Sequence, residues 1–338
     1  MVRFECKLND ISIPEIFSLY EEVVPNKNKE IKNYYKNIEY NWNLMLESKG
    51  KIGFVLSCKN PVSNRKCSLS FWRSTMNGWV GQQLISNGFT EGVYSLLLRV
   101  QEMAIDNNIY SIQNWFRPDN KYTSKLFQLS TNQLGSDKSF CNESIYINLY
   151  PSNVFQDKDI SIIQCTNNNH NNIYDFISDV CGEVYAKIEE LHKDDIELEN
   201  LHEIYQQYNL ARKRFLFLAY QKNFSYPVGA AIVYRGPFGV NVRLIENQCK
   251  VFIKNHLDIE LQRSIFSSLL YHCKEKYTDF PVKYIPISIN RNSAILEFFD
   301  QSMVKNITTY FNIGWIDKGF TDWYSFVDNY NYFKNKKI

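Results

Sequence analysis

The chain has 338 residues, of which 44% are hydrophobic and 22% are charged, and its formal net charge is +2. This length and composition exclude a disordered or fibrous chain and predict a globular protein with two domains. The near-neutral charge argues against duplex nucleic acid as a partner. No apolar run reaches the roughly 18 residues of a membrane span, and no secretory signal begins the sequence, so we expect a cytoplasmic protein.

Apolar periodicity and turn residues predict a first domain over residues 1–150. Its expected elements are a strand at 3–8, helices at 13–24 and 26–46, strands at 52–58, 66–74 and 79–85, a helix at 92–107, a strand at 110–116, a short helix at 118–129 and a strand at 139–149.

A polar segment over residues 151–172 is typical of a linker, although a strand-like run at 160–165 lies inside it. We place a second domain over residues 151–338. Its expected elements are helices at 173–190 and 197–214, strands at 215–221 and 228–235, one or two strands within 240–253, a helix at 261–277, a strand at 282–289, a helix at 293–301 and a last strand within 314–328.

The order of elements repeats along the chain, and local sequence matches keep the same spacing. The run that starts at Tyr94 matches the run that starts at Phe266, an offset of 266 − 94 = 172. Asn120 and Asn292 keep that offset, since 292 − 120 = 172. A constant offset across a helix and the next strand indicates a duplicated α/β unit.

Cysteine and histidine are scattered in this sequence. There are eight cysteines and five histidines, with no pair of cysteines separated by two residues. This pattern predicts reduced thiols and no metal site.

A glycine-bearing turn joins the strand at 79–85 to the helix at 92–107. It contains Asn87, Gly88, Thr90 and Gly92. Unpaired amides at a helix N-terminus, together with the helix dipole, form a site for a phosphate or pyrophosphate, and glycine lets a ligand approach the backbone closely. The same residues are also ordinary turn and capping chemistry, so both interpretations stay open.

The repeated unit resembles the GCN5-related N-acetyltransferase (GNAT) fold. In that family, loop amides in the pattern Arg/Gln-x-x-Gly-x-Gly/Ala hold the pyrophosphate of acyl-CoA, and a later Asn-x-x-Ala-x-x-Leu-Tyr helix supplies a tyrosine as general acid. The first loop here keeps Gly92, whereas the second, with Ser264 at the matching position, has no glycine. Both asparagine motifs end in phenylalanine, Phe127 and Phe299, so the acid tyrosine is absent.

The resemblance implies an α/β (α+β) fold with two GNAT-like domains, each a mixed, mostly antiparallel twisted sheet flanked by helices. It implies a candidate catalytic base at Glu246, for which the residues themselves favour a solvent-facing or Arg243-paired carboxylate. The cofactor-binding candidates that it implies are Ile85, Asn87, Gly88, Thr90, Gly92 and Asn120.

The implied activity is an acyltransferase that moves an acyl group from acetyl-CoA or another acyl-CoA to an amine acceptor, either a small molecule or a peptide. Two alternatives stay open. One is an aminoacyltransferase that resembles the Fem proteins and uses aminoacyl-tRNA. The other is a catalytically degenerate tandem protein that only binds a partner.

Overall fold

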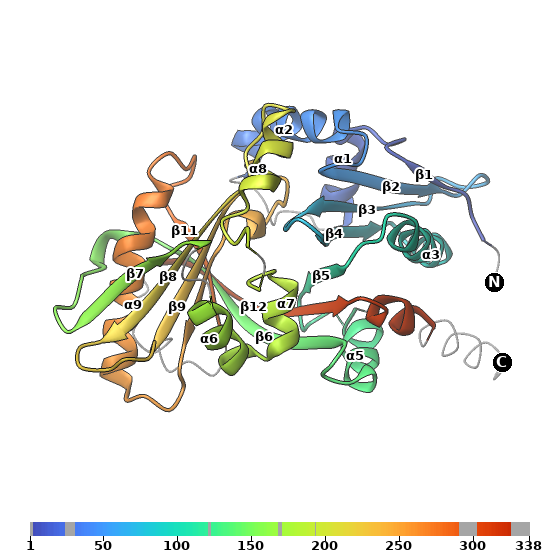
Figure 1. Ribbon diagram of the computed structural model, residues 1–338. Coiled ribbons are helices and arrows are strands. Elements are labelled where there is room, and N and C mark those ends of the chain that lie inside the picture. The colour runs from blue at the N-terminus through green and yellow to red at the C-terminus, as the bar shows by residue number, and fades with distance from the viewer. Residues whose placement is uncertain are drawn as a thin grey trace.

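The computed structural model describes residues 3–23, 31–120, 123–167, 171–192, 194–290 and 303–325 (Figure 1). The strands are β1 (Cys6–Leu8), β2 (Gly53–Lys59), β3 (Lys66–Arg73), β4 (Gly78–Ser86), β5 (Ser111–Phe116), β6 (Ser139–Leu149), β7 (Ile160–Cys165), β8 (Lys213–Gln221), β9 (Gly229–Arg235), β10 (Cys249–Ile253), β11 (Ile285–Asn290) and β12 (Val304–Ile316). The α-helices are α1 (Ile13–Val23), α2 (Tyr35–Glu47), α3 (Thr90–Asp106), α5 (Leu129–Leu134), α6 (Asn171–Cys181), α7 (Glu183–Ile188), α8 (Glu199–Gln206) and α9 (Ile259–Cys273).

Within these residues the strands form one sheet in the order β1-β2-β3-β4-β5-β12-β6-β11-β10-β9-β8-β7. Only the β4–β5 and β10–β11 pairs are parallel. The predicted mixed, mostly antiparallel α/β architecture is therefore confirmed. The order of strands is symmetric about the β12–β6 pair, which is the arrangement that a duplicated unit would form. The boundary between residues 150 and 151 stays a prediction.

The last strand of each half pairs with the other half of the sheet. In β12, Phe311 pairs with Phe116 of β5, and in β6, Ile147 pairs with Ile287 of β11. β12 and β6 also pair with each other along most of their length. Each half of the sheet is thus completed by a strand from the other half of the chain.

Several expected elements differ from the structure. The helix expected at 173–190 is two helices, α6 and α7, which Gly182 separates at a φ of 92°. The run at 160–165, expected within a linker because of its polar flanks, forms the edge strand β7. Pairing with β8 supplies hydrogen bonds to its backbone. The helix expected at 197–214 ends at Gln206, and Asn209 at a φ of 55° turns the chain toward β8. Residues 236–248 form a loop before β10. The last strand is Val304–Ile316 rather than a strand within 314–328. The helix expected at 293–301 lies outside the described residues.

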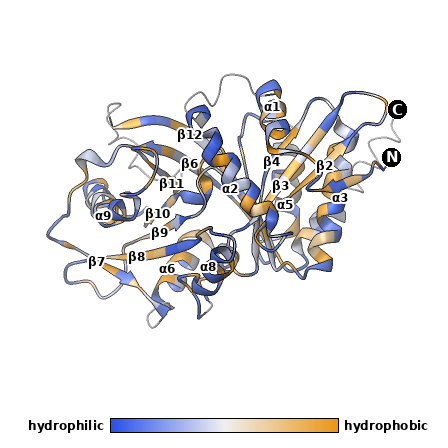
Figure 2. Ribbon diagram, turned by 90° about the horizontal axis from the view of Figure 1, so that it is seen from above, coloured by the Kyte–Doolittle hydropathy of each residue, from blue (hydrophilic) through white to orange (hydrophobic). Residues whose placement is uncertain are grey.

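Helices cover both faces of the sheet. Phe54 and Leu56 of β2 pack in one apolar cluster with Leu96 of α3, whereas the intervening Val55 packs in a second cluster with Trp42 of α2. Alternate residues of a strand point to opposite faces, so β2 is buried on both sides. Figure 2 shows the long hydrophobic stretches along strands β2 to β4 that this burial requires.

Candidate functional site

The parallel strands β4 and β5 diverge after a short paired segment. Residues 78–81 pair with residues 111–114, and the pairing ends there. A bulge in β4 adds to the divergence: its register against β3 shifts by one residue, and Gln83 adopts a φ of 54°. A bulge bends its strand and interrupts the ladder. The result is a wedge between two strands whose inner backbone edges are not paired with each other.

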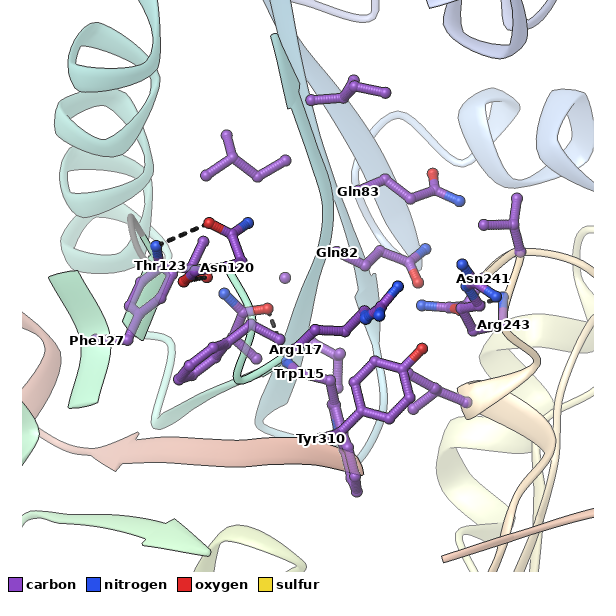
Figure 3. A pocket seen from close by; sticks show the side chains of 18 of the residues that line it. Gln82, Gln83, Trp115, Arg117, Asn120, Thr123, Phe127, Asn241, Arg243 and Tyr310 are labelled. Carbon is purple, nitrogen blue, oxygen red and sulfur yellow. Dashed lines mark hydrogen bonds between the residues drawn. The ribbon is translucent and has the colours of Figure 1, made fainter. Parts of the chain in front are cut away.

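A cavity of about 580 Å³ occupies this wedge (Figure 3). Its walls come from β4, β5, the start of α3, the end of α1, β12, and the loop at residues 236–248 in the second half. The polar side chains on its walls are Tyr20, Gln82, Gln83, Ser86, Asn114, Arg117, Asp119, Asn120, Thr123, Asn241, Arg243 and Tyr310.

Val93, the fourth residue of α3, lines the cavity, whereas residues 87–92 at the start of the helix do not, and the N-cap residue Phe89 makes no side-chain capping hydrogen bond. In the second half, by contrast, the Asp258 carboxylate caps α9 by accepting a hydrogen bond from the amide of Leu261 at 2.9 Å. A carboxylate at that position occupies the place where a phosphate would bind. The cavity beside β10 and β11 measures only about 20 Å³. The wedge of the first half is open, whereas residues 291–302, which follow β11 in the second half, lie outside the described residues.

Two of the predicted cofactor-binding residues, Ile85 and Asn120, line the cavity; the other four do not. The carboxamide oxygen of Asn87 accepts a hydrogen bond from the amide of Lys66 at 2.7 Å, which fixes the turn. Gly88 needs its positive φ of 88°, and Thr90 is exposed in the first turn of α3. Their roles toward a cofactor stay predictions.

Gly92 has a packing role that the sequence did not indicate. A Cβ at this position would lie 2.4 Å from Cδ1 of Phe89 and 2.8 Å from Sγ of Cys67. We expect Gly92→Ala to lower the free energy of unfolding by about 1–3 kcal/mol in chemical denaturation, because overpacking exceeds the roughly 1 kcal/mol that alanine gains over glycine in a helix. A more stable variant would contradict this assignment.

The asparagine motif of the first half starts a helical segment. The Asn120 carboxamide accepts a hydrogen bond from the amide of Thr123 at 3.3 Å. Phe127 lines the cavity where the family motif has tyrosine, so no phenol stands at that position. The second motif, which begins at Asn292, lies outside the described residues.

Glu246 is fully buried and does not line the cavity, although its neighbour Ile245 does. One carboxylate oxygen accepts hydrogen bonds from the amide of Gly239 at 3.0 Å and from Nδ2 of Asn247 at 3.1 Å. The other oxygen has no hydrogen-bond partner among the described residues. Burial raises the pKa of this carboxyl to about 8. These contacts hold together the loop before β10, and the catalytic role stays a prediction.

Three residues on the cavity wall were not expected from the sequence as part of a site: Arg117, Arg243 and Tyr310. Burial raises the pKa of the Tyr310 phenol, and the nearby Arg243 and Arg117 guanidinium groups lower it. Figure 3 shows the three side chains directed toward a common space. They come from segments far apart in the sequence: the pairing of β12 with β5 brings Tyr310 near Arg117, and the loop at residues 236–248 carries Arg243 to the same cavity. Their local spacing carries no signal of this arrangement.

The part of the chain that the structure describes contains no group of three metal-ligating side chains, and all eight cysteines are free thiols. None of its helices has the length and hydrophobicity needed to cross a membrane.

No protein-family model matches the sequence, and no curated protein matches it. Among solved structures, the chain is similar to a GCN5-related N-acetyltransferase from Sphaerobacter thermophilus, with 11% identity, a TM-score of 0.40 and coverage of 93% of this chain and 96% of that chain. A GCN5-related N-acetyltransferase from Anabaena variabilis has 10% identity and a TM-score of 0.33, with coverage of 91% and 72%. A functionally unknown conserved protein from Staphylococcus epidermidis has 13% identity and a TM-score of 0.41, with coverage of 74% and 91%.

Structures named as GCN5-related N-acetyltransferases are thus among the neighbours, as the resemblance stated from the sequence predicts. Since all three TM-scores are below 0.5, the proposals that follow rest on the geometry of this chain.

Proposed function

We propose that the protein is an acyltransferase that moves an acyl group from acyl-CoA to an amine within the wedge between β4 and β5. The observation that carries the proposal is the open cavity at the divergence of two parallel strands, with Val93 of α3 on its wall and no side-chain capping hydrogen bond from the N-cap residue of that helix. The unpaired inner edge of β4 would hydrogen-bond the amides of the pantetheine arm. The N-terminus of α3 would bind the pyrophosphate.

The reaction forms a bond between the amine nitrogen and the acyl carbon and breaks the bond between that carbon and sulfur. The amine loses a proton, and CoA leaves as a thiolate that takes up a proton. Tyr310 supplies a phenol on the cavity wall, and its raised pKa keeps this phenol protonated at neutral pH. It would give its proton to the leaving thiolate and recover one from the amine.

A second candidate function is binding without catalysis. Asp119 is the only carboxylate among the described residues that line the cavity, and its oxygen lies 2.7 Å from Nη2 of Arg117. This carboxylate is thus already engaged by a guanidinium group. If the amine needs a carboxylate base, the cavity would bind ligands without turning them over.

Calorimetric titration with acetyl-CoA, a long-chain acyl-CoA and free CoA, together with an assay for thiol release, tests the proposal. Binding with thiol release in the presence of an amine supports transfer, whereas binding without release under any amine supports the second candidate. If no CoA species binds, acyl-CoA transfer is excluded, and an aminoacyl-tRNA transfer assay then tests the remaining alternative.

A variant locates the binding site. Asn114 is the last β5 residue paired with β4, and its side chain lines the cavity. We expect Asn114→Trp to weaken acetyl-CoA binding at least about tenfold, roughly 1.4 kcal/mol, because the indole fills the narrow end of the wedge. Asn200→Trp, at an exposed position in α8, is the matched control and should bind normally. Unchanged binding by a folded Asn114→Trp would place the donor elsewhere.

A further inference from the structure

One wall of the cavity belongs to the second half of the chain. In the first half, β3 and β4 are joined by a tight turn in which the amide of Ser74 donates to the carbonyl of Gly78 at 2.9 Å. In the second half, the matching strands β9 and β10 are joined by the much longer loop at residues 236–248. Asn241, Val242 and Arg243 of this loop line the wedge of the first half.

Hydrogen bonds from the first half fix this loop in place. The carbonyl of Val240 accepts from Nε2 of Gln82 at 2.6 Å, and the carbonyl of Gly239 accepts from Nε1 of Trp42 at 3.1 Å. The phenol of Tyr146 donates to the carbonyl of Arg243. An anchored backbone on both sides holds the Arg243 side chain at a defined place on the cavity wall.

Arg243 is half-buried and has no carboxylate partner among the described residues. Its neighbours are the phenols of Tyr20, Tyr310 and Tyr146, and it hydrogen-bonds to Tyr20. A guanidinium group presents several donors in a planar fork that matches a carboxylate or phosphate. Removed from bulk water and without an anion, this group is set to bind one.

Two further observations point to a ligand at this wall. Arg117 lies on the other side of Tyr310, close enough for both guanidinium groups to lower the pKa of that phenol. Gln82 is only 5% exposed, and its carboxamide oxygen has no hydrogen-bond partner in the described structure. The wall therefore carries an excess of positive charge and a polar atom without a hydrogen-bond partner. An anionic ligand would neutralise the positive charge.

We propose that the acceptor amine carries an anionic group, a carboxylate or a phosphate, that Arg243 binds with help from Arg117. In this proposal the second half of the chain binds the acceptor, and the donor occupies the wedge of the first half. The assignment of this anion to an acceptor rests on the acyltransferase function proposed above. The binding of an anionic ligand by Arg243 does not.

Paired probes that differ in a single anionic group test this inference. Glycine is compared with glycinamide for the carboxylate, and phosphoethanolamine with ethanolamine for the phosphate. In wild-type protein with acetyl-CoA, we expect the anionic member of at least one pair to give about tenfold higher kcat/KM, as one charge-assisted hydrogen-bond pair would provide. In Arg243→Gln this preference should fall to about one, while the Kd for acetyl-CoA changes less than about twofold.

Thermal shift with the same probes, in the absence of acetyl-CoA, separates the two proposals. A shift for the anionic member that Arg243→Gln removes supports the anion site even if acetyl-CoA never binds. Equal behaviour of both members in every pair overturns the inference. Loss of acetyl-CoA binding in Arg243→Gln also overturns it, because Arg243 would then bind a phosphate of the donor.

Two further variants make the test specific. Arg65→Gln removes the same charge at an exposed turn and should leave every readout unchanged. Asp119→Asn frees Arg117 from its 2.7 Å ion pair and should increase the preference for the anionic probes. A preference that does not increase would show that Arg117 takes no part in binding the anion.

Discussion

The free energy of unfolding of the wild-type protein should fall as the pH rises from about 5 to 8, and Glu246→Gln should abolish the part of this decrease that Glu246 causes. Burial raises the pKa of the Glu246 carboxyl to about 8, above its ordinary value of 4.5. Between these values the folded protein keeps a proton that the unfolded chain has released. Stability therefore falls with pH, by up to about 1.4 kcal/mol per pH unit, and stops falling above pH 8, where both states are ionised.

The measurement is chemical denaturation of both proteins at a series of pH values. The difference between them isolates Glu246 from other groups that titrate in this range, such as His202, whose pKa is lowered by burial. Glutamine resembles the protonated carboxyl, so the variant should match wild type at pH 5 and exceed it at pH 8. Parallel pH profiles would mean that the carboxylate is ionised in the folded protein.

The same variant tests the catalytic role that the sequence suggested. If the Glu246 carboxyl is structural, Glu246→Gln should release thiol at the normal rate, since the side chain lies outside the cavity lining. A general base at this position predicts a severe loss of kcat with unchanged acetyl-CoA affinity. Stability and turnover in one variant thus distinguish the two roles.

Much of the fold could be predicted because its elements carry strong local patterns. β2 to β4 are apolar runs bounded by turns, and α3 follows the glycine-bearing turn directly. The errors fall where tertiary pairing decides the structure. β7 is recognisable as a strand-like run but is assigned to a linker from the sequence, because its own residues do not reveal that it pairs with β8. β12 is half-exposed at its start, and its place between β5 and β6 depends on residues far away in the sequence.

The candidate site was predictable only where it follows the local motif. Ile85 and Asn120 were expected from the resemblance, and they line the cavity. Arg117, Arg243 and Tyr310 could not be inferred, because three segments meet there only after each half exchanges its last strand. The packing role of Gly92 was also hidden, since a glycine in a loop pattern does not reveal which side chain lies against it.

Glu189→Ala should destabilise the protein by about 3–5 kcal/mol, the usual cost of leaving a buried charge without its partner. Its carboxylate lies 2.6 Å from Nζ of Lys250, and both side chains are almost fully buried. The phenol of Tyr234 also donates to it, and Nε2 of Gln113 lies 3.4 Å away. Burial opposes ionisation of Glu189, but the Lys250 charge and the hydrogen bonds from Lys250 and Tyr234 together outweigh it, so the pKa of this carboxyl is lowered.

The partners of Glu189 come from both halves of the sheet: Gln113 lies on β5, Tyr234 on β9 and Lys250 on β10. Loss of the carboxylate should therefore weaken the junction between the halves rather than one of them. Denaturation of Glu183→Ala, which removes an exposed carboxylate paired with Lys187, is the control and should show little change. The double variant Glu189→Leu/Lys250→Met should recover much of the lost stability, because neither member of this ion pair is then left buried without the other. If it is as unstable as Glu189→Ala, the loss comes from packing rather than from charge.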